Sequence, residues 1–388
     1  MSDEAADGAP LRVLIIDDEP VEARALMHAL VRQGKADIYE PDDLTPDVLN
    51  GNDVILVDYD LSQWPAAMQD ADPARSPADG LALAAVLRSR VMPDYRKGRP
   101  VAFALHSSQL DRIGGNLDRE VREHAIARVH NLEWVFDKRP DTGLPPLAER
   151  VWQFAAAVRS LPDSWPAEPD EARQALAALL EWSDQLPAAD LAWAHVLRCH
   201  PPLHELSVAT DGLTCLRWLA HRILPYPCFL SDALHVAVRL HLDPDELRND
   251  GEGDLDGLAH ALAQRRYGGA LSELVGPRWW RAAIDEWLWS LGSGAPLDGA
   301  ALHAALERVA GRTLKPLDID SPVVVLDERY RPQPKPASIA DAVRIQPDDW
   351  PPFADDAWAT LDLVAEHPRL RDQVVPDDRD LLDDVPSS

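Results

Sequence analysis

Short apolar runs alternate with amphipathic stretches along roughly the first 160 residues of the chain. The apolar runs are rich in β-branched residues and are bounded by polar ones, which predicts buried strands at 13–16, 37–40, 54–57, 101–105 and 134–136. The stretches between them carry apolar residues at helical spacing, which predicts helices at 20–33, 80–88 and 147–161. Strands that alternate with helices favour right-handed crossovers, so we expect an α/β fold with a doubly wound, five-stranded parallel sheet.

The pattern changes after a proline-bearing hinge at 161–166, beyond which apolar residues recur almost throughout with the period of a helix. Helices are predicted at 169–185, 187–199, 212–224, 229–240, 254–265, 278–291 and 299–309, and a lone strand at 323–326. From about residue 328 the chain is rich in proline and acidic residues. We therefore expect a disordered N-terminus (1–10), an α/β domain (11–162), a mainly helical domain (163–327) and an extended arm or tail (328–388).

Composition excludes several classes of protein. The 388 residues are too many for one ordinary core. A net charge of −28 repels nucleic-acid phosphates, and no basic stripe offsets it, so no nucleic-acid partner is expected. No run of 18 residues lacks charge and residues 1–10 are polar, so we expect no membrane segment and a cytoplasmic protein. Three cysteines, an odd number, favour reduced thiols.

Polar side chains follow the predicted strands of the first domain. The carboxyl ends of parallel strands meet at one edge of a sheet, so these side chains should converge. Crowded carboxylates are stable mainly around a divalent cation, and oxygen ligands suit Mg²⁺. With a lysine nearby, an aspartate there can attack a phosphoryl group, because both cations neutralise the transferring oxygens. The residues concerned are Asp17, Asp18, Asp58, Asp60, Ser107, Ser108 and Lys138.

In this order, these residues resemble the receiver domain of bacterial two-component response regulators, over roughly residues 10–160. The resemblance implies a flavodoxin-like sheet and a bound Mg²⁺. It also implies a role for each residue: Asp58 as the phosphoacceptor, Asp17, Asp18, Asp58 and the main-chain carbonyl of Asp60 as metal ligands, Ser107 as the switch hydroxyl and Lys138 as the phosphate-binding lysine.

Several positions depart from the family pattern. Gly80 lies 22 residues after Asp58, so 62–79 is an insertion beside the acceptor. The segment between Ser107 and Lys138 is also long, and the position three before the lysine, aromatic in the family, is Val135. Either Ser107 or Ser108 can supply the switch hydroxyl. The acceptor residues are therefore retained, whereas the region that reports phosphorylation differs.

The second part of the chain shows no comparable set. Its histidines and cysteines include His195 and Cys199, one helical turn apart, but no Cys-x-x-Cys or His-Glu-x-x-His spacing, so we interpret them as surface histidines and buried thiols. Trp280, Ile284 and Trp287 share a helical face, which indicates a buried stripe or, alternatively, a protein-docking hot spot. No phosphate loop, nucleophile elbow or zinc signature points to an enzyme.

The favoured hypothesis is a response-regulator-like signalling protein that takes phosphate from a histidine kinase or a phosphotransfer protein. Its helical part would then act on an effector protein, and the family resemblance also allows a homodimer. Three alternatives remain at this point. Residues 165–388 could form an enzyme for a small molecule or nucleotide, gated by the receiver. The chain could buffer phosphate in a relay or serve a defence module. The receiver could also be degenerate and bind a partner without phosphorylation.

Overall fold

The computed structural model describes residues 10–64, 77, 79–95, 99–115, 119–139, 144–203, 211–247 and 257–382. It divides the chain into two compact units. The N-terminal unit comprises Met1–Glu181, Pro202–His221 and Gly268–Gly276, and the C-terminal unit comprises Trp182–Pro201, Arg222–Tyr267 and Pro277–Ser388. Residues 167–181 and two later segments, all of which follow the hinge at 161–166 in the sequence, thus belong to the N-terminal unit.

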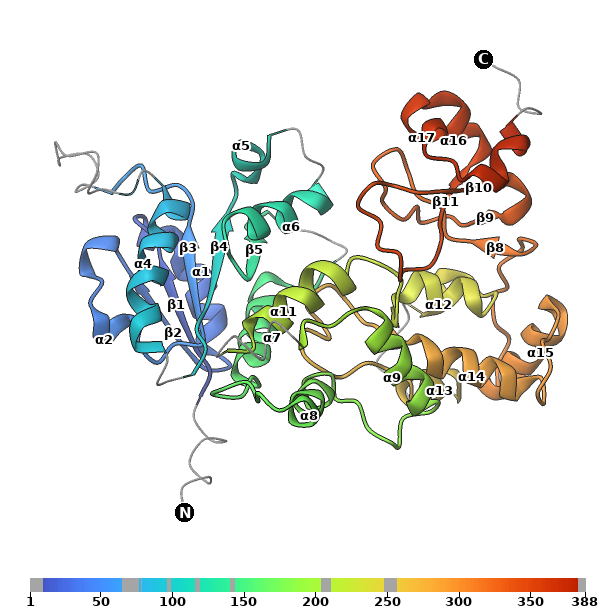
Figure 1. Cartoon of the computed structure of the whole chain (residues 1–388), viewed down its shortest axis with the longest axis horizontal. Helices are drawn as coiled ribbons and strands as arrows, with labels where there is room; N and C mark the ends of the chain where they lie inside the picture. Colours follow the sequence, from blue (N-terminus) through green and yellow to red (C-terminus); the bar gives the residue numbers. More distant parts are fainter. Residues whose placement is uncertain are drawn as a thin grey trace. The chain divides into compact units, whose positions relative to one another are not determined.

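A five-stranded parallel sheet forms the centre of the N-terminal unit (Figure 1). Its strands occur in the order β2-β1-β3-β4-β5, which is that of flavodoxin-like folds. This confirms the predicted fold class, with a strand at each of the five predicted positions. The strands are β1 (Arg12–Ile16), β2 (Lys35–Tyr39), β3 (Val54–Asp58), β4 (Ala102–Ser107) and β5 (Trp134–Asp137).

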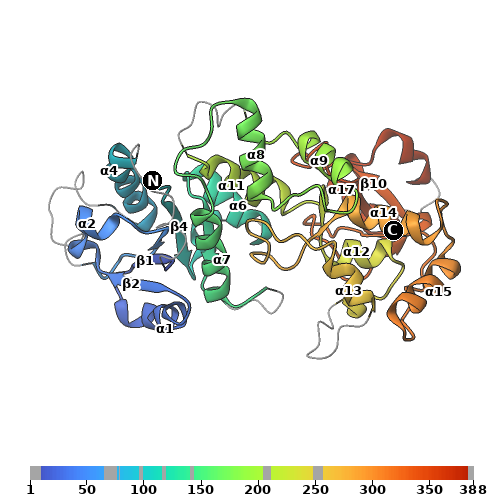
Figure 2. The ribbon, with the colours of Figure 1, turned by 90° about the horizontal axis from the view of Figure 1, so that it is seen from below.

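Helices cover both faces of this sheet, which is why its central strands are almost wholly apolar. The helices α1 (Pro20–Val31) and α4 (Gly80–Tyr95) lie on opposite faces (Figure 2). The helix α7 (Leu147–Arg159) contacts α1, and the indole Nε1 of Trp152 donates to the carbonyl of Leu30 at 3.0 Å. The unit also contains α2 (Pro46–Leu49), α5 (Leu110–Gly114), α6 (Arg119–Val129), α8 (Pro169–Leu179), α11 (Leu213–Trp218) and the short η1 (Pro41–Asp43).

The two later segments bind the N-terminal unit through polar contacts. Arg217 of α11 pairs with the buried Glu133 before β5. Arg150 of α7, also buried, donates from Nε to the carbonyl of Leu274 at 3.0 Å. Ala270 donates its main-chain N–H to the carbonyl of Leu179 at 2.8 Å. Contacts between residues so far apart in sequence leave no local pattern, so the hinge alone did not reveal the limits of this unit.

The C-terminal unit contains helices at the predicted places, most of them shorter than expected. They are α9 (Ala189–Arg198), α12 (Ala233–Arg239), α13 (Gly257–Ala263), α14 (Arg281–Leu291) and α15 (Gly299–Ala310). Trp280, Ile284 and Trp287 are all buried, as the buried-stripe interpretation expects. Trp279 is buried as well. It forms with Trp280 the short strand β7 (Trp279–Trp280), which pairs with β6 (Leu230–Ser231), so the helix predicted from residue 278 begins only at Arg281.

The segment expected to be an extended arm or tail carries a small core. In β10 (Ala342–Ile345) and β11 (Ala357–Thr360), which pair antiparallel, Val343, Ile345, Ala357 and Ala359 are buried together with Val364. These apolar residues are few, but the hairpin and the helices after it bring them together. The remaining elements are β8 (Pro322–Val323), β9 (Ala337–Ser338), α16 (Leu361–Glu366), α17 (Pro368–Asp372), the π-helical Leu219–Ile223 and the 3₁₀ turns Pro244–Leu247, Ile339–Asp341 and Pro376–Leu382.

None of the described helices is both long enough and apolar enough to cross a bilayer. The longest, α4, has 16 residues, against the ~20 apolar residues that a span requires.

Candidate functional site

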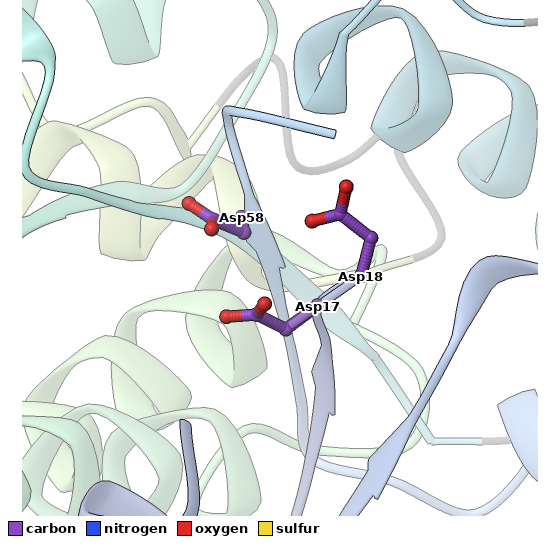
Figure 3. Close-up of side chains that lie close together, drawn as sticks. All are labelled: Asp17, Asp18 and Asp58. Atoms are coloured by element: carbon purple, nitrogen blue, oxygen red, sulfur yellow. The ribbon is translucent and has the colours of Figure 1, made fainter. Parts of the chain in front are cut away.

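Three carboxylates gather at the carboxyl edge of the sheet. Asp17 and Asp18 directly follow β1, and Asp58 ends the neighbouring strand β3 (Figure 3). One oxygen from each lies within 4.8 Å of one from each of the others. Among the described residues this is the one group of three or more side chains able to share a metal ion. The acidic pair and the lone aspartate, 41 residues apart in sequence, thus form one cluster.

Lys138 adds a positive charge to this cluster. It follows β5, and its main-chain N–H donates to the carbonyl of Ser107 at 3.0 Å, which holds it against β4. Its Nζ donates to Asp58 Oδ2 at 2.9 Å and lies 3.5 Å from Asp17 Oδ2. The side chains of Asp17 and Asp58 are 1% and 12% exposed. The ammonium therefore neutralises part of a largely buried negative charge.

The electrostatics of the cluster follow from burial and charge. Burial raises the pKa of Asp58 to about 6, against the opposing attraction of Lys138. Burial also raises the pKa of Asp18, and repulsion from Asp17 and Asp60 adds to it. Burial lowers the pKa of Lys138, but Asp58 and Asp17 outweigh it, so this pKa lies above its ordinary value. One ammonium does not fully compensate three carboxylates, which is the situation that a divalent cation relieves.

Main-chain N–H groups hold the carboxylates in place. Asp17 Oδ1 accepts from Glu19 at 2.8 Å, and Asp58 Oδ1 accepts from Tyr59 at 2.7 Å. Asp18 Oδ2 accepts from Gln63 at 2.6 Å, so the start of the insertion at 62–79 folds back onto the acidic pair. Most of that insertion, 65–76 and 78, lies outside the described residues.

Gly80, the first residue of α4, packs directly against the acceptor strand. A Cβ atom at this position would lie 1.7 Å from the carbonyl oxygen of Asp58. Its main-chain N–H donates to the carbonyl of Tyr59 at 2.9 Å. The helix can begin this close to Asp58 only because its first residue has no side chain.

Replacing Gly80 by alanine is expected to displace the Asp58 backbone and to lower the free energy of unfolding of the N-terminal unit by about 1–3 kcal/mol. Chemical denaturation measures the loss. Gly299→Ala is the matched control, because Gly299 also begins a helix and a Cβ there would have only an ordinary 3.6 Å contact with His241. Equal stability of the two variants would contradict the close approach of Gly80 to Asp58.

The structure places Ser107 and Asp60 in hydrogen bonds of their own. Ser107 is buried, and its Oγ accepts from the main-chain N–H of Gln109 at 2.9 Å, whereas Ser108 is exposed. The Asp60 carboxylate accepts from Ser62 N–H at 3.2 Å and from Gln109 Nε2 at 2.5 Å. The side chain of Asp60 thus lies outside the carboxylate cluster, and its main-chain carbonyl remains the predicted metal ligand.

Sequence analysis gave no role to His106, the residue before Ser107. It is 4% exposed, and neither ring nitrogen has a hydrogen-bond partner among the described residues. Burial, and next the charge of Lys138, lower its pKa to about 3, so the ring is neutral. The signal in the sequence was a histidine that comes before the terminal serine of an otherwise apolar strand, Ala102–Ser107.

The histidines and cysteines of the second part form no group of three potential metal ligands in the described chain. Cys199, Cys215 and Cys228, all among the described residues, are buried and form no disulfide, in agreement with the thiols expected from the sequence. His204 lies outside the described residues.

Comparisons with known proteins add one finding. No protein-family model matches the sequence, and no curated protein matches it. Among solved structures, RcsB from Salmonella enterica serovar Typhimurium, bound to promoter rprA in the presence of phosphomimetic BeF3-, matches with 12% identity and a TM-score of 0.23. The match covers 55% of this chain and 90% of that one. The assignment of the fold rests on the strand order of the sheet, and that order fits a receiver domain.

Proposed function

We propose that this chain is a receiver-type signalling protein in which Asp58 accepts a phosphoryl group in a Mg²⁺-dependent step. The observation that carries the proposal is the position of Asp58. Its carboxylate shares a cluster with Asp17 and Asp18 and binds Lys138 at the carboxyl edge of a flavodoxin-like sheet. Ligands bind at that edge in open α/β sheets.

The donor set fits Mg²⁺. Asp17, Asp18 and Asp58 would hold the ion through carboxylate oxygens, together with the main-chain carbonyl of Asp60 that the family resemblance implies. Burial raises the pKa values of Asp18 and Asp58, and repulsion from Asp17 adds to both shifts. When bound, the ion supplies positive charge that neutralises the oxygens of the transferring phosphoryl group.

The residues of the chain perform the transfer. A carboxylate oxygen of Asp58 attacks the phosphorus of a phosphorylated histidine on a kinase or phosphotransfer protein. A P–O bond forms and the P–N bond breaks, and the electron pair of that bond returns to the imidazole of the donor. Lys138 Nζ, 2.9 Å from Asp58 Oδ2, is placed to donate to a phosphoryl oxygen. Its positive charge compensates the charge that the group brings.

The output in this proposal is contact with an effector protein. Phosphorylation shifts a two-state equilibrium of the N-terminal unit. Ser107 is the proposed switch hydroxyl. Its Oγ accepts from the Gln109 N–H, which leaves its own hydrogen for donation to a phosphoryl oxygen. With a net charge of −28, the chain is suited to a protein partner rather than to nucleic acid.

Phosphorylation by acetyl phosphate tests the proposal without a cognate kinase. With Mg²⁺, the wild type should gain one phosphoryl group, seen by intact mass spectrometry and lost on treatment with hydroxylamine, which cleaves acyl phosphates. Asp58→Asn should abolish the gain, and chelation of the metal should prevent it. Asp37→Asn, an exposed aspartate on β2, is the control. A wild type that stays unmodified, or an Asp58→Asn protein that is still modified, would refute the proposal.

A further inference from the structure

His106 is a buried side chain whose polar atoms make no hydrogen bond within the described residues. Its ring is 4% exposed, and both Nδ1 and Nε2 lack a hydrogen-bond partner among the described residues. Leaving a buried donor and a buried acceptor unpaired is unfavourable, and native proteins rarely do so without a functional reason. The residue also follows four buried apolar residues in its strand, Ala102 to Leu105.

The strand register places this ring beside the acceptor. His106 of β4 is the direct partner of Asp58 of β3 in the parallel pair. Partnered residues of neighbouring parallel strands project from the same face, about 4.8 Å apart, whereas the next residue projects from the other face. The side chains of His106 and Asp58 therefore lie on one face of the sheet. The charge of Lys138, which binds Asp58, also acts on the His106 ring.

The same alternation separates His106 from Ser107. Ser107 partners Asp137 of β5, and its Oγ accepts from the Gln109 N–H. On the face of Asp58, the unpaired polar side-chain atoms in the described part of β4 are those of His106.

We propose that the neutral imidazole of His106 is a phosphoryl-binding residue, whose N–H donates a hydrogen bond to an oxygen of phosphorylated Asp58. This inference rests on the proposed function and adds a donor to it. In the described part of the unmodified protein the donor is unpaired, and the phosphoryl group supplies its acceptor. His106 therefore favours the phosphorylated state over the unmodified one. It leaves the binding of Mg²⁺ alone unaffected, because the carboxylates hold the metal.

Beryllofluoride, which binds an aspartate as a phosphoryl mimic, is the probe. Its apparent dissociation constant is measured by ¹⁹F NMR on the full chain with Mg²⁺, for the wild type, His106→Leu and His106→Gln. We expect leucine to weaken binding about ten-fold or more, the loss of one hydrogen bond to a charged group. Glutamine retains an N–H donor and should recover part of the loss. His28→Leu, the same change at an exposed position of α1, should bind as the wild type does.

The affinity for Mg²⁺ alone distinguishes a phosphoryl-binding role of His106 from a purely structural one. All these variants should keep the wild-type affinity for Mg²⁺. Should leucine leave the unit unfolded, His106→Met removes the same nitrogen atoms with a more adaptable side chain. Wild-type affinity for beryllofluoride in a folded leucine or methionine variant would overturn the inference, as would an equal loss of Mg²⁺ binding. If the wild type itself binds no beryllofluoride, the proposed function fails, and not this inference alone.

Discussion

Replacing Glu133 by alanine is expected to lower the free energy of unfolding of the N-terminal unit by about 3–5 kcal/mol. Glu133 is 1% exposed. Its Oε2 accepts from Arg88 Nη2 and from the main-chain N–H of Phe103, each at 2.6 Å, and its Oε1 accepts from Arg217. Burial raises the pKa of Glu133, but Arg88 and Arg217 outweigh it, so the group is ionised at neutral pH. Alanine would leave Arg88, 7% exposed, as a buried charge without its carboxylate.

Two further variants distinguish the loss of this ion pair from a general loss of packing. Arg217→Ala should cost less, because the side chain of Arg217 is 30% exposed and Arg88 still neutralises Glu133. Glu133→Leu combined with Arg88→Leu should recover much of the loss, since no buried charge remains unpaired. Chemical denaturation, with hydrogen exchange of the β4 and β5 amides, gives the free energies. A cost of Glu133→Ala under about 1 kcal/mol would show that the carboxylate is not the link described here.

Replacing Asp58 by asparagine is expected to stabilise the metal-free protein at pH 8 by up to about 3 kcal/mol. The pKa of Asp58 is about 6 in the folded chain, against an ordinary value of 3.8, and that difference corresponds to about 3 kcal/mol. Because the pKa is raised, the stability that Asp58 contributes is complete below pH 3.8 and is lost as the pH rises through 6. Asparagine removes this loss because it carries no charge.

The pH dependence and the metal provide the checks on this second prediction. The advantage of asparagine should shrink as the pH falls from 8 through 6 and should be lost below 3.8, where the wild-type carboxyl group becomes protonated in both states. Added Mg²⁺ should stabilise the wild type more than the variant, because asparagine is the poorer ligand. Asp37→Asn, at an exposed position, should change stability by less than about 0.5 kcal/mol. Lower stability of Asp58→Asn at pH 8 without metal would contradict the pKa argument.

The first domain was the more predictable part because its determinants are local. A buried parallel strand must be a short apolar run, so the segments ending at Ile16, Asp58 and Ser107 could be recognised without the fold. Polar residues at the ends of such strands then share one edge by topology alone. That is why Asp17, Asp58 and Lys138 could be grouped in advance, although their roles remain proposals.

The local helical signal was weaker evidence for domain limits. Each of the seven helices predicted between 169 and 309 has a counterpart in the described residues, but the apolar period does not say which core each one joins. The helix α11 joins the N-terminal unit through Arg217 and Glu133, which are 84 residues apart. The small core around Val343 and Val364 likewise needs a hairpin to assemble it from sparse apolar residues.

By itself the sequence determined the five strands of the parallel sheet, most of the helices and the set of polar residues at the ends of those strands, because each depends on the properties of a few consecutive residues. The tertiary structure alone decided the partners of Glu133, the close approach of Gly80 to Asp58 and the burial of His106 beside the acceptor. These depend on strand order, register and contacts between distant segments. Such features arise only when the chain closes on itself, and no local pattern of polar and apolar residues encodes them.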